Sequence, residues 1–176
     1  MLLPRVRGAD DLRAAARAAY YPPLGARGVS ASTRAAGYSA AGLKACVNKR
    51  CEQILLVPII EHPDAVAHID AICALPEVLA IAFGVNDLSF AMGHGFAMLE
   101  SAEVQAAHAA VLAAARRHGV AVMGSPREHD TTTAQQVVDE GASALIYGPD
   151  LSLFQKMCAQ MATAHRAVAG LPRCPG

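Results

Sequence analysis

Residues 54–90 read ILLVPIIEHPDAVAHIDAICALPEVLAIAFGVNDLSF and decide the fold. They contain two short apolar runs, 54–60 and 78–83, and such unbroken hydrophobic runs are typical of parallel strands buried on both faces. Between the runs, Pro63 and Asp64 favour the start of a helix, because proline is tolerated at the first helical position and an acidic side chain suits the first turn. The stretch therefore predicts a strand, a crossover helix and a second parallel strand.

The alternation of strands and helices continues on both sides of this stretch. Five strand-then-helix units in strict order predict one parallel sheet with right-handed crossovers. We expect a single α/β domain over residues 1–170 and a disordered tail over residues 171–176. Residues 85–98 are expected to form a loop. Further strands are predicted near 2–6, 120–123 and 144–147, and helices at 9–20, 39–48, 63–75, 101–118, 131–140 and 151–168.

Two architectures fit this order of elements. One is an open, doubly wound sheet of five strands with helices on both faces. The other is part of a (β/α)₈ barrel, in which each strand neighbours the next along the chain. A complete barrel needs eight strands and typically about 250 residues, whereas this chain has 176. Length alone therefore favours the open sheet.

The composition indicates a globular chain with no nucleic-acid or membrane partner. Hydrophobic residues make up 53% and charged residues 17%, and 15 basic residues balance 15 acidic ones. A formal charge of zero gives no electrostatic basis for binding nucleic acid or an anionic membrane. No apolar run approaches the roughly 20 residues that cross a bilayer, and no signal peptide is expected. The five cysteines are odd in number and form no CxxC pair, which favours reduced thiols and a cytoplasmic location.

Two acidic residues follow the two central strands. Glu61 ends the first apolar run, and Asp87 lies shortly after the second. Neighbouring strands are about 4.8 Å apart, and the carboxyl ends of parallel strands meet at one rim. Hard cations such as Mg²⁺ or Mn²⁺ take oxygen ligands, often one or two carboxylates completed by water and substrate. The pair is therefore a candidate metal site, although two solvated acids or helix caps would give the same pattern.

Four stretches of the sequence resemble one known family in both order and spacing. They are YPPLGARG at 21–28, the strand 55–61 ending in Glu61, FGVNDLS at 83–89 followed by Met-Gly at 92–93, and YGPD at 147–150. Together they resemble the HpcH/HpaI aldolases, which are metal-dependent class II pyruvate aldolases of the aldolase/citrate lyase family. The resemblance covers nearly the whole chain and favours the barrel over the open sheet.

The resemblance implies a fold, an activity and a set of site residues. The expected fold class is α/β, as an incomplete TIM (β/α)₈-type barrel with five parallel β/α units. The implied activity is that of a carbon–carbon lyase cleaving 4-hydroxy-2-oxoacids to pyruvate and an aldehyde, with Lewis-acid assistance from Mg, Mn or Co and no Schiff base. Glu61 and Asp87 correspond to the metal ligands. Asn86 and Asp87 correspond to substrate-binding positions, Asn86 through its backbone at the pyruvate carboxylate. A homo-oligomer is expected, with the last helix packed onto a neighbouring barrel.

The sequence also departs from the family pattern. MLLPRV at 1–6 matches the fourth barrel strand, so the three earlier units, which carry a His base with its acidic neighbour and an Arg, have no counterpart here. Ile59 stands where well-studied members have Gln, and the usual GPxDL run is GVNDL. Catalytic residues are therefore not assigned, and cleavage by the isolated chain is expected to be impaired. The alternative is a non-catalytic, truncated or decayed paralogue that retains metal and oxoacid binding.

A few other residues could contribute to a site. Arg27 could face the site rim or hold its loop through backbone hydrogen bonds, and the second role is favoured. His62 could act as a base or cap a helix, and capping is favoured. His94 is a weaker candidate base. The turns at Gly124-Ser125 and Gly148 could bind phosphate, but two short glycine turns are weak evidence for it.

Overall fold

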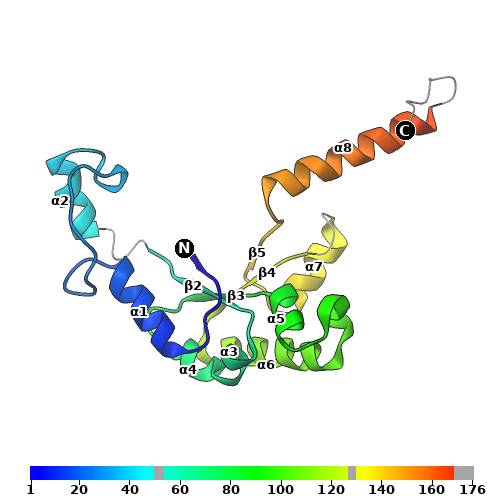
Figure 1. Cartoon of the computed structure of the whole chain (residues 1–176), viewed down its shortest axis with the longest axis horizontal. Helices are drawn as coiled ribbons and strands as arrows, with labels where there is room; N and C mark the ends of the chain where they lie inside the picture. Colours follow the sequence, from blue (N-terminus) through cyan, green and yellow to red (C-terminus); the bar gives the residue numbers. More distant parts are fainter. Residues whose placement is uncertain (50–53, 127–129, 169–176) are drawn as a thin grey trace.

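The computed structural model describes residues 1–49, 54–126 and 130–168 (Figure 1). Its strands are β1 (Leu2–Leu3), β2 (Val57–Ile60), β3 (Ala80–Phe83), β4 (Ala121–Gly124) and β5 (Ala144–Leu145). Its helices are α1 (Ala9–Ala19), η1 (Arg34–Ala36), α2 (Ala40–Lys49), α3 (Pro63–Ala67), α4 (Ile69–Cys73), α5 (Val85–Ala91), η3 (Gly95–Glu100), α6 (Ala102–His118), α7 (Thr131–Asp139) and α8 (Asp150–Ala167).

The five strands form one parallel sheet in the order β1-β2-β3-β4-β5. Each strand pairs with the next along the chain, with Leu2 opposite Val57 and Ile59 opposite Ala82 in the first two pairs. The spatial order thus follows the sequence order without a reversal. An open doubly wound sheet reverses its winding direction, whereas a barrel never does. The predicted order of strands is confirmed.

The two faces of the sheet are covered differently. One face contributes Ile60, Ile81 and Val122 to the main core, where they pack with Leu12 of α1 and Val111 of α6. The other face carries the alternate strand residues. They form a second buried cluster that consists of strand side chains only, namely Val57, Ala80 and Ala82, packed against Ile59, Ala121 and Met123. Figure 1 draws α3, α4 and α6 together on one side of the strands. Helices on one face and strand side chains on the other are the layers of a barrel wall.

Three predictions about the elements need correction. Residues 85–91 form the helix α5 rather than the start of a loop. The single helix expected at 63–75 is divided into α3 and α4 at His68, whose φ of −104° and ψ of 17° lie outside the helical region. Strands β1 and β5 contain two residues each and are shorter than predicted. The tail expected at residues 171–176 lies outside the described residues.

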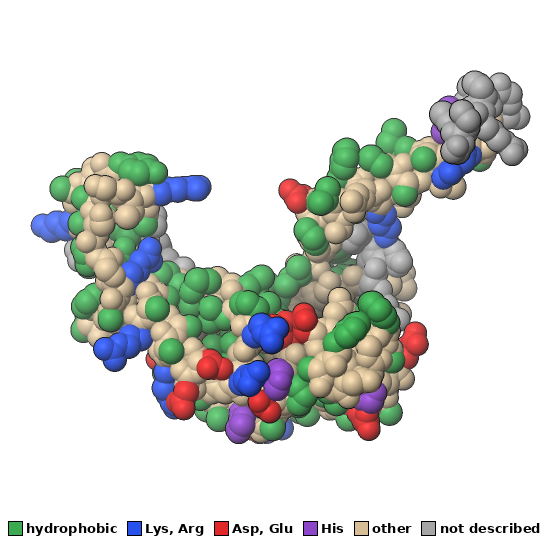
Figure 2. All heavy atoms as spheres, in the orientation of Figure 1, with side chains coloured by type: hydrophobic (Ala, Val, Ile, Leu, Met, Phe, Trp, Pro, Cys, Tyr) green, Lys and Arg blue, Asp and Glu red, His purple; other side chains and the backbone are tan. Residues whose placement is uncertain are grey.

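The last helix extends away from the sheet (Figure 1). None of the residues of α8 is buried. Figure 2 shows hydrophobic side chains gathered in the hollow between this helix and the arm that carries α2. Within the described residues, no helix is long and apolar enough to cross a membrane.

Candidate functional site

Glu61 follows the last residue of β2 and is held in place by the chain that leaves β1. Its side chain is buried, with 8% exposure. The backbone N–H of Arg5 donates a hydrogen bond to Glu61 Oε1 over 2.6 Å. A buried carboxylate needs such a partner, because its desolvation is otherwise uncompensated. The first two strands therefore fix the position of this acid together.

Gly84, directly after β3, leaves room for the Glu61 side chain. A Cβ atom at this position would lie 2.7 Å from Glu61 Cβ, 2.8 Å from Glu61 Oε2 and 2.9 Å from the Ile59 side chain. Such separations are shorter than real Cβ contacts. The Gly84 backbone also donates to the Ile60 carbonyl oxygen over 3.0 Å, which ties β3 to β2 at this point. Glycine is required here for close approach of the two strand ends.

Asp87 lies in the first turn of α5, where the helix dipole favours a negative charge. Its side chain is exposed, and so is that of Asn86 beside it. Asp87 and Glu61 line the same small cavity of about 70 Å³, together with Arg5, Arg7, His62 and Ala91. The structure thus brings the two predicted acids to one site at the carboxyl ends of the strands. Asn86 is not among the described residues that line this cavity.

The oxygen atoms of this pair fit a hard divalent cation that keeps part of its water shell. Carboxylates are the ligands such ions prefer, and Mg²⁺ is often held by only one or two of them. Over residues 1–49, 54–126 and 130–168 there is no group of three or more His, Cys, Asp or Glu side chains that could hold a metal ion. The site therefore suits an ion completed by water and a ligand rather than one caged by protein.

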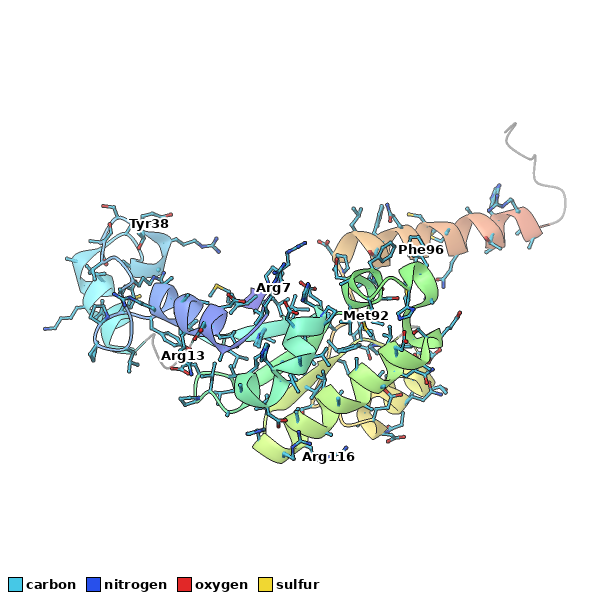
Figure 3. The ribbon with its side chains drawn as sticks, turned by 60° about the horizontal axis from the view of Figure 1, so that its bottom comes forward. Arg7, Arg13, Tyr38, Met92, Phe96 and Arg116 are labelled. Carbon is cyan, nitrogen blue, oxygen red and sulfur yellow. The ribbon has the colours of Figure 1, made fainter. Side chains whose placement is uncertain are left out.

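Two arginines of this site were missed by the sequence analysis. Arg5 and Arg7 line the cavity from the connection between β1 and α1. Figure 3 labels Arg7 near the start of α1. The strand predicted near residues 2–6 includes Arg5, so only Arg7 was expected beyond a strand end, where an arginine is usually a solvated side chain.

The other candidates are engaged in local contacts. His62 Nδ1 accepts a hydrogen bond from the Asp64 backbone N–H over 3.2 Å, so the capping role favoured from the sequence is confirmed. His94 Nε2 contacts Glu103 of α6. Arg27 donates to the Ala19 carbonyl oxygen over 3.5 Å, which agrees with the loop-holding role.

A second cavity of about 150 Å³ lies between α6, β4 and α7 and contains neither Glu61 nor Asp87. His108 lines it and stacks against Phe83, with 4.6 Å between the ring centroids. Burial lowers the pKa of His108, and the charge of Glu140 opposes this effect. This histidine therefore favours its neutral form, as expected beneath a helix layer. Ser125 donates to the Ile146 carbonyl oxygen over 2.9 Å at the end of this region, and phosphate binding at this turn stays a prediction.

Comparison with known proteins agrees with this geometry. The family described as HpcH/HpaI aldolase/citrate lyase matches residues 1–156. The chain is 35% identical over 161 residues to a hydroxypyruvate/pyruvate aldolase of Delftia acidovorans, a match that covers 89% of this chain and 56% of that protein. It is 30% identical over 177 residues to a hydroxypyruvate/pyruvate aldolase of Pseudomonas aeruginosa, with 98% and 63% covered.

A solved structure shows the same likeness in three dimensions. The crystal structure of an HpcH/HpaI aldolase from Desulfitobacterium hafniense superposes with a TM-score of 0.83 at 30% identity, covering 98% of this chain and 65% of that one. The chain thus spans between 56% and 65% of the lengths of these three proteins. The parallel sheet, with its strands in sequence order, agrees with the matched family. The chain belongs to the HpcH/HpaI aldolase/citrate lyase family.

Proposed function

We propose that this chain provides the metal-binding and oxoacid-binding part of a carbon–carbon lyase acting on 4-hydroxy-2-oxoacids. The ion would be Mg²⁺, Mn²⁺ or Co²⁺, held by Glu61 and Asp87. The observation that carries the proposal is that these two acids, 26 positions apart in the sequence, line one small cavity at the carboxyl ends of β2 and β3. Family membership supports the reaction class, since the relatives named above are aldolases.

The residues of the chain have separate parts in this proposal. Glu61 is rigidly placed by the Arg5 N–H, so it offers a fixed ligand. The Asp87 side chain makes no hydrogen bond or ion pair with another described residue, so its oxygens are available to a ligand. The backbone of Asn86, in the same turn, would meet the pyruvate carboxylate. A bound divalent cation would supply Lewis-acid polarisation of the 2-oxo group.

The base that aldol cleavage needs is not assigned to a residue of this chain. His62 is the one histidine among the described residues that line the cavity, and its Nδ1 is used as a helix cap. Loss of a general base typically removes about 10²–10⁴-fold in rate. Cleavage by this chain alone is therefore expected to be weak. The same observation favours a second candidate function, in which the protein binds the metal and a 2-oxoacid without chemistry.

Two further properties belong to the same proposal. The protein would act as a homo-oligomer, because α8 exposes large apolar side chains from Leu151 to Met161. It would work in the cytoplasm, a location favoured by the odd number of cysteines and the lack of paired CxxC spacing in the sequence.

Calorimetric titration with Mn²⁺, alone and with oxalate as a pyruvate analogue, tests the site. The parent protein and an Asp10→Ala control, which removes an exposed acid of α1, should bind the ion equally. Asp87→Ala and Glu61→Gln should each weaken binding at least about tenfold, because one carboxylate competes poorly with water for the ion. Equal binding by Asp87→Ala and the parent would falsify the assignment.

A pyruvate-release assay on the same preparations separates the two candidate functions. Weak turnover that is lost with Asp87→Ala would support the lyase. Metal and oxalate binding without any turnover would support the non-catalytic binding protein. Fast turnover by the parent would show that a base lies elsewhere in the chain.

A further inference from the structure

Two exposed arginine residues line the same small cavity as the carboxylate pair. Arg5 and Arg7 line it together with Glu61 and Asp87. Their backbones are engaged: the Arg5 N–H donates to Glu61, and the Arg7 N–H donates to Asp11 over 2.8 Å. Neither guanidinium forms an ion pair or hydrogen bond with another described residue. Within the described part of the chain, two arginine side chains without an ion pair therefore line the same cavity as two acids.

The backbone of Arg5 has a conformation that points to a role at this site. Its φ is +57°, in the left-handed region that side-chain-bearing residues rarely adopt. Residues held in such conformations gather at ligand sites, where the surrounding structure maintains them. Here the hydrogen bond from the Arg5 N–H to Glu61 Oε1 provides that support. The chain thus fixes an arginine directly beside a proposed metal ligand at the cost of local strain.

The charges of the cavity indicate what the arginines would bind. Glu61 and Asp87 together carry two negative charges, which a divalent cation balances. The guanidinium groups of Arg5 and Arg7 then leave two positive charges without counterions. A 4-hydroxy-2-oxoacid brings one negative charge on its carboxylate. When its C3–C4 bond breaks and the 4-hydroxyl proton passes to water, the pyruvate enolate that remains carries two negative charges. With the two acids, the divalent cation, the two arginines and such a dianion together, the net charge at the cavity is zero.

From this balance we infer that Arg5 and Arg7 bind the negative charge of the ligand in addition to the Asn86 backbone, and that they select the dianionic form of a 2-oxoacid. The inference rests on the proposed function, since it assumes a cation between Glu61 and Asp87. Guanidinium groups suit the task because their planar donor fork matches a carboxylate and they are always charged. Arg5 thereby supplies, from the end of β1, a stabilising cation for negative charge that develops on the substrate.

The two kinds of ligand should respond to the arginines in opposite directions. A positive charge beside the cation site repels the metal ion, so removing it should leave Mn²⁺ binding unchanged or stronger. The same change removes a partner of the anion, so it should weaken oxalate binding to the Mn²⁺-loaded protein. A merely structural role for Arg5 would weaken both ligands together.

The test measures Mn²⁺ affinity from the electron paramagnetic resonance signal of the free ion, and then oxalate affinity by calorimetry at saturating Mn²⁺. Arg5→Gly removes the guanidinium and also relieves the positive φ, so the fold should be kept. Arg5→Lys retains the positive charge but loses the planar pair of N–H donors. Arg7→Gln tests whether the second arginine contributes to oxalate binding. The control is Arg13→Gln on α1, since Arg13 pairs with Asp10 and lies apart from Arg7 in Figure 3.

Arg5→Gly and Arg7→Gln should each weaken oxalate binding about tenfold or more, while Mn²⁺ affinity is kept or raised and Arg13→Gln matches the parent. Arg5→Lys should fall between the parent and Arg5→Gly. Parent-like oxalate affinity in both Arg5→Gly and Arg7→Gln would overturn the inference and leave the metal site intact. A parent protein that binds no Mn²⁺ would overturn the proposed function and this inference with it.

Discussion

Because Gly84 has no side chain, the buried Glu61 side chain can pack directly against the backbone that leads to Asp87. We predict that Gly84→Ala destabilises the protein by about 1–3 kcal/mol, as overpacking of a dense site usually does. Its added Cβ would meet Glu61 Cβ at 2.7 Å, and the neighbouring atoms belong to a buried side chain that cannot swing away. The same displacement should weaken Mn²⁺ binding. Urea unfolding and metal titration check the two effects, and a variant with parent-like values in both would contradict this account.

Buried Cys73 provides a prediction about pH. Burial raises the pKa of its thiol to about 11, and the nearby charge of Asp70 adds to the effect. The thiolate is the reactive form, so Cys73 should resist alkylation by iodoacetamide at about pH 8. Cys158 is exposed in the single chain and should be labelled before Cys73 in the monomeric protein. Peptide mapping by mass spectrometry during the reaction measures both rates, and equal labelling of the folded protein at the two positions would count against the prediction.

The same thiol affects stability at high pH. Its neutral form is favoured in the folded state, whereas the unfolded chain ionises near the ordinary value of 9.0. The contribution of Cys73 to stability is therefore complete below about pH 9 and declines as the pH rises towards 11. A Cys73→Ala variant should show a smaller decline over this range in thermal unfolding.

Among the elements, the central strands could be predicted and the helix α5 could not. The runs 54–60 and 78–83 are hydrophobic at consecutive positions, and this pattern marks buried parallel strands without further information. Helix α5 is short and has no side-chain cap at Gly84. Its position depends on Ser89, whose hydroxyl donates to the Gly95 carbonyl oxygen over 2.7 Å and accepts from the Met98 N–H over 3.0 Å. Such contacts with a following turn leave no periodic pattern in the sequence.

The C-terminal end of α6 can be predicted from a single residue type, the glycine that follows the helix. The helix was predicted to end at residue 118, and the next residue, Gly119, adopts the left-handed conformation with a φ of +67°. We predict that Gly119→Ala destabilises the protein by about 1 kcal/mol. Apart from its own chain neighbours, no described residue has an atom within 4 Å of the position that a Cβ would take, so the cost is conformational and not steric. Thermal unfolding measures it, and Gly119→Asn should recover part of the loss, because asparagine tolerates this region. Metal binding should be unaffected, in contrast to Gly84→Ala.

At the scale of the whole molecule, the meeting of Glu61 and Asp87 at one cavity could be predicted, because topology alone brings them together. Glu61 and Asp87 follow adjacent parallel strands, so any sheet with this order places them at one rim. The arginines could not be predicted in the same way. The direction of the Arg5 side chain depends on a positive φ and on a hydrogen bond to Glu61, and neither can be read from residue types. A sequence pattern gives the strand end at which a residue lies, but not the cavity that its side chain lines.

The exposed surface of α8 leads to a prediction about assembly. Leu151, Phe154, Met157 and Met161 follow one another at intervals of three or four residues, which places them on one face of the helix. Their exposures are 59%, 67%, 56% and 65%, which is unusual for large apolar side chains in a row. An amphipathic helix with no buried residue of its own has to bury this face elsewhere, and a second copy of the chain presents hydrophobic side chains in the hollow above the sheet (Figure 2).

We therefore expect an oligomer at micromolar concentration that is held together by this helix. Phe154→Lys places a charge in the middle of the apolar face, where burial against a partner becomes unfavourable. It should shift the mass measured by light scattering after size-exclusion chromatography towards the monomer. Ala159→Lys adds the same charge to the exposed opposite side of α8 and should leave the mass unchanged. A parent protein that elutes as a stable monodisperse monomer would contradict the prediction. Dissociation by both variants alike would show that net charge, and not the apolar face, governs assembly.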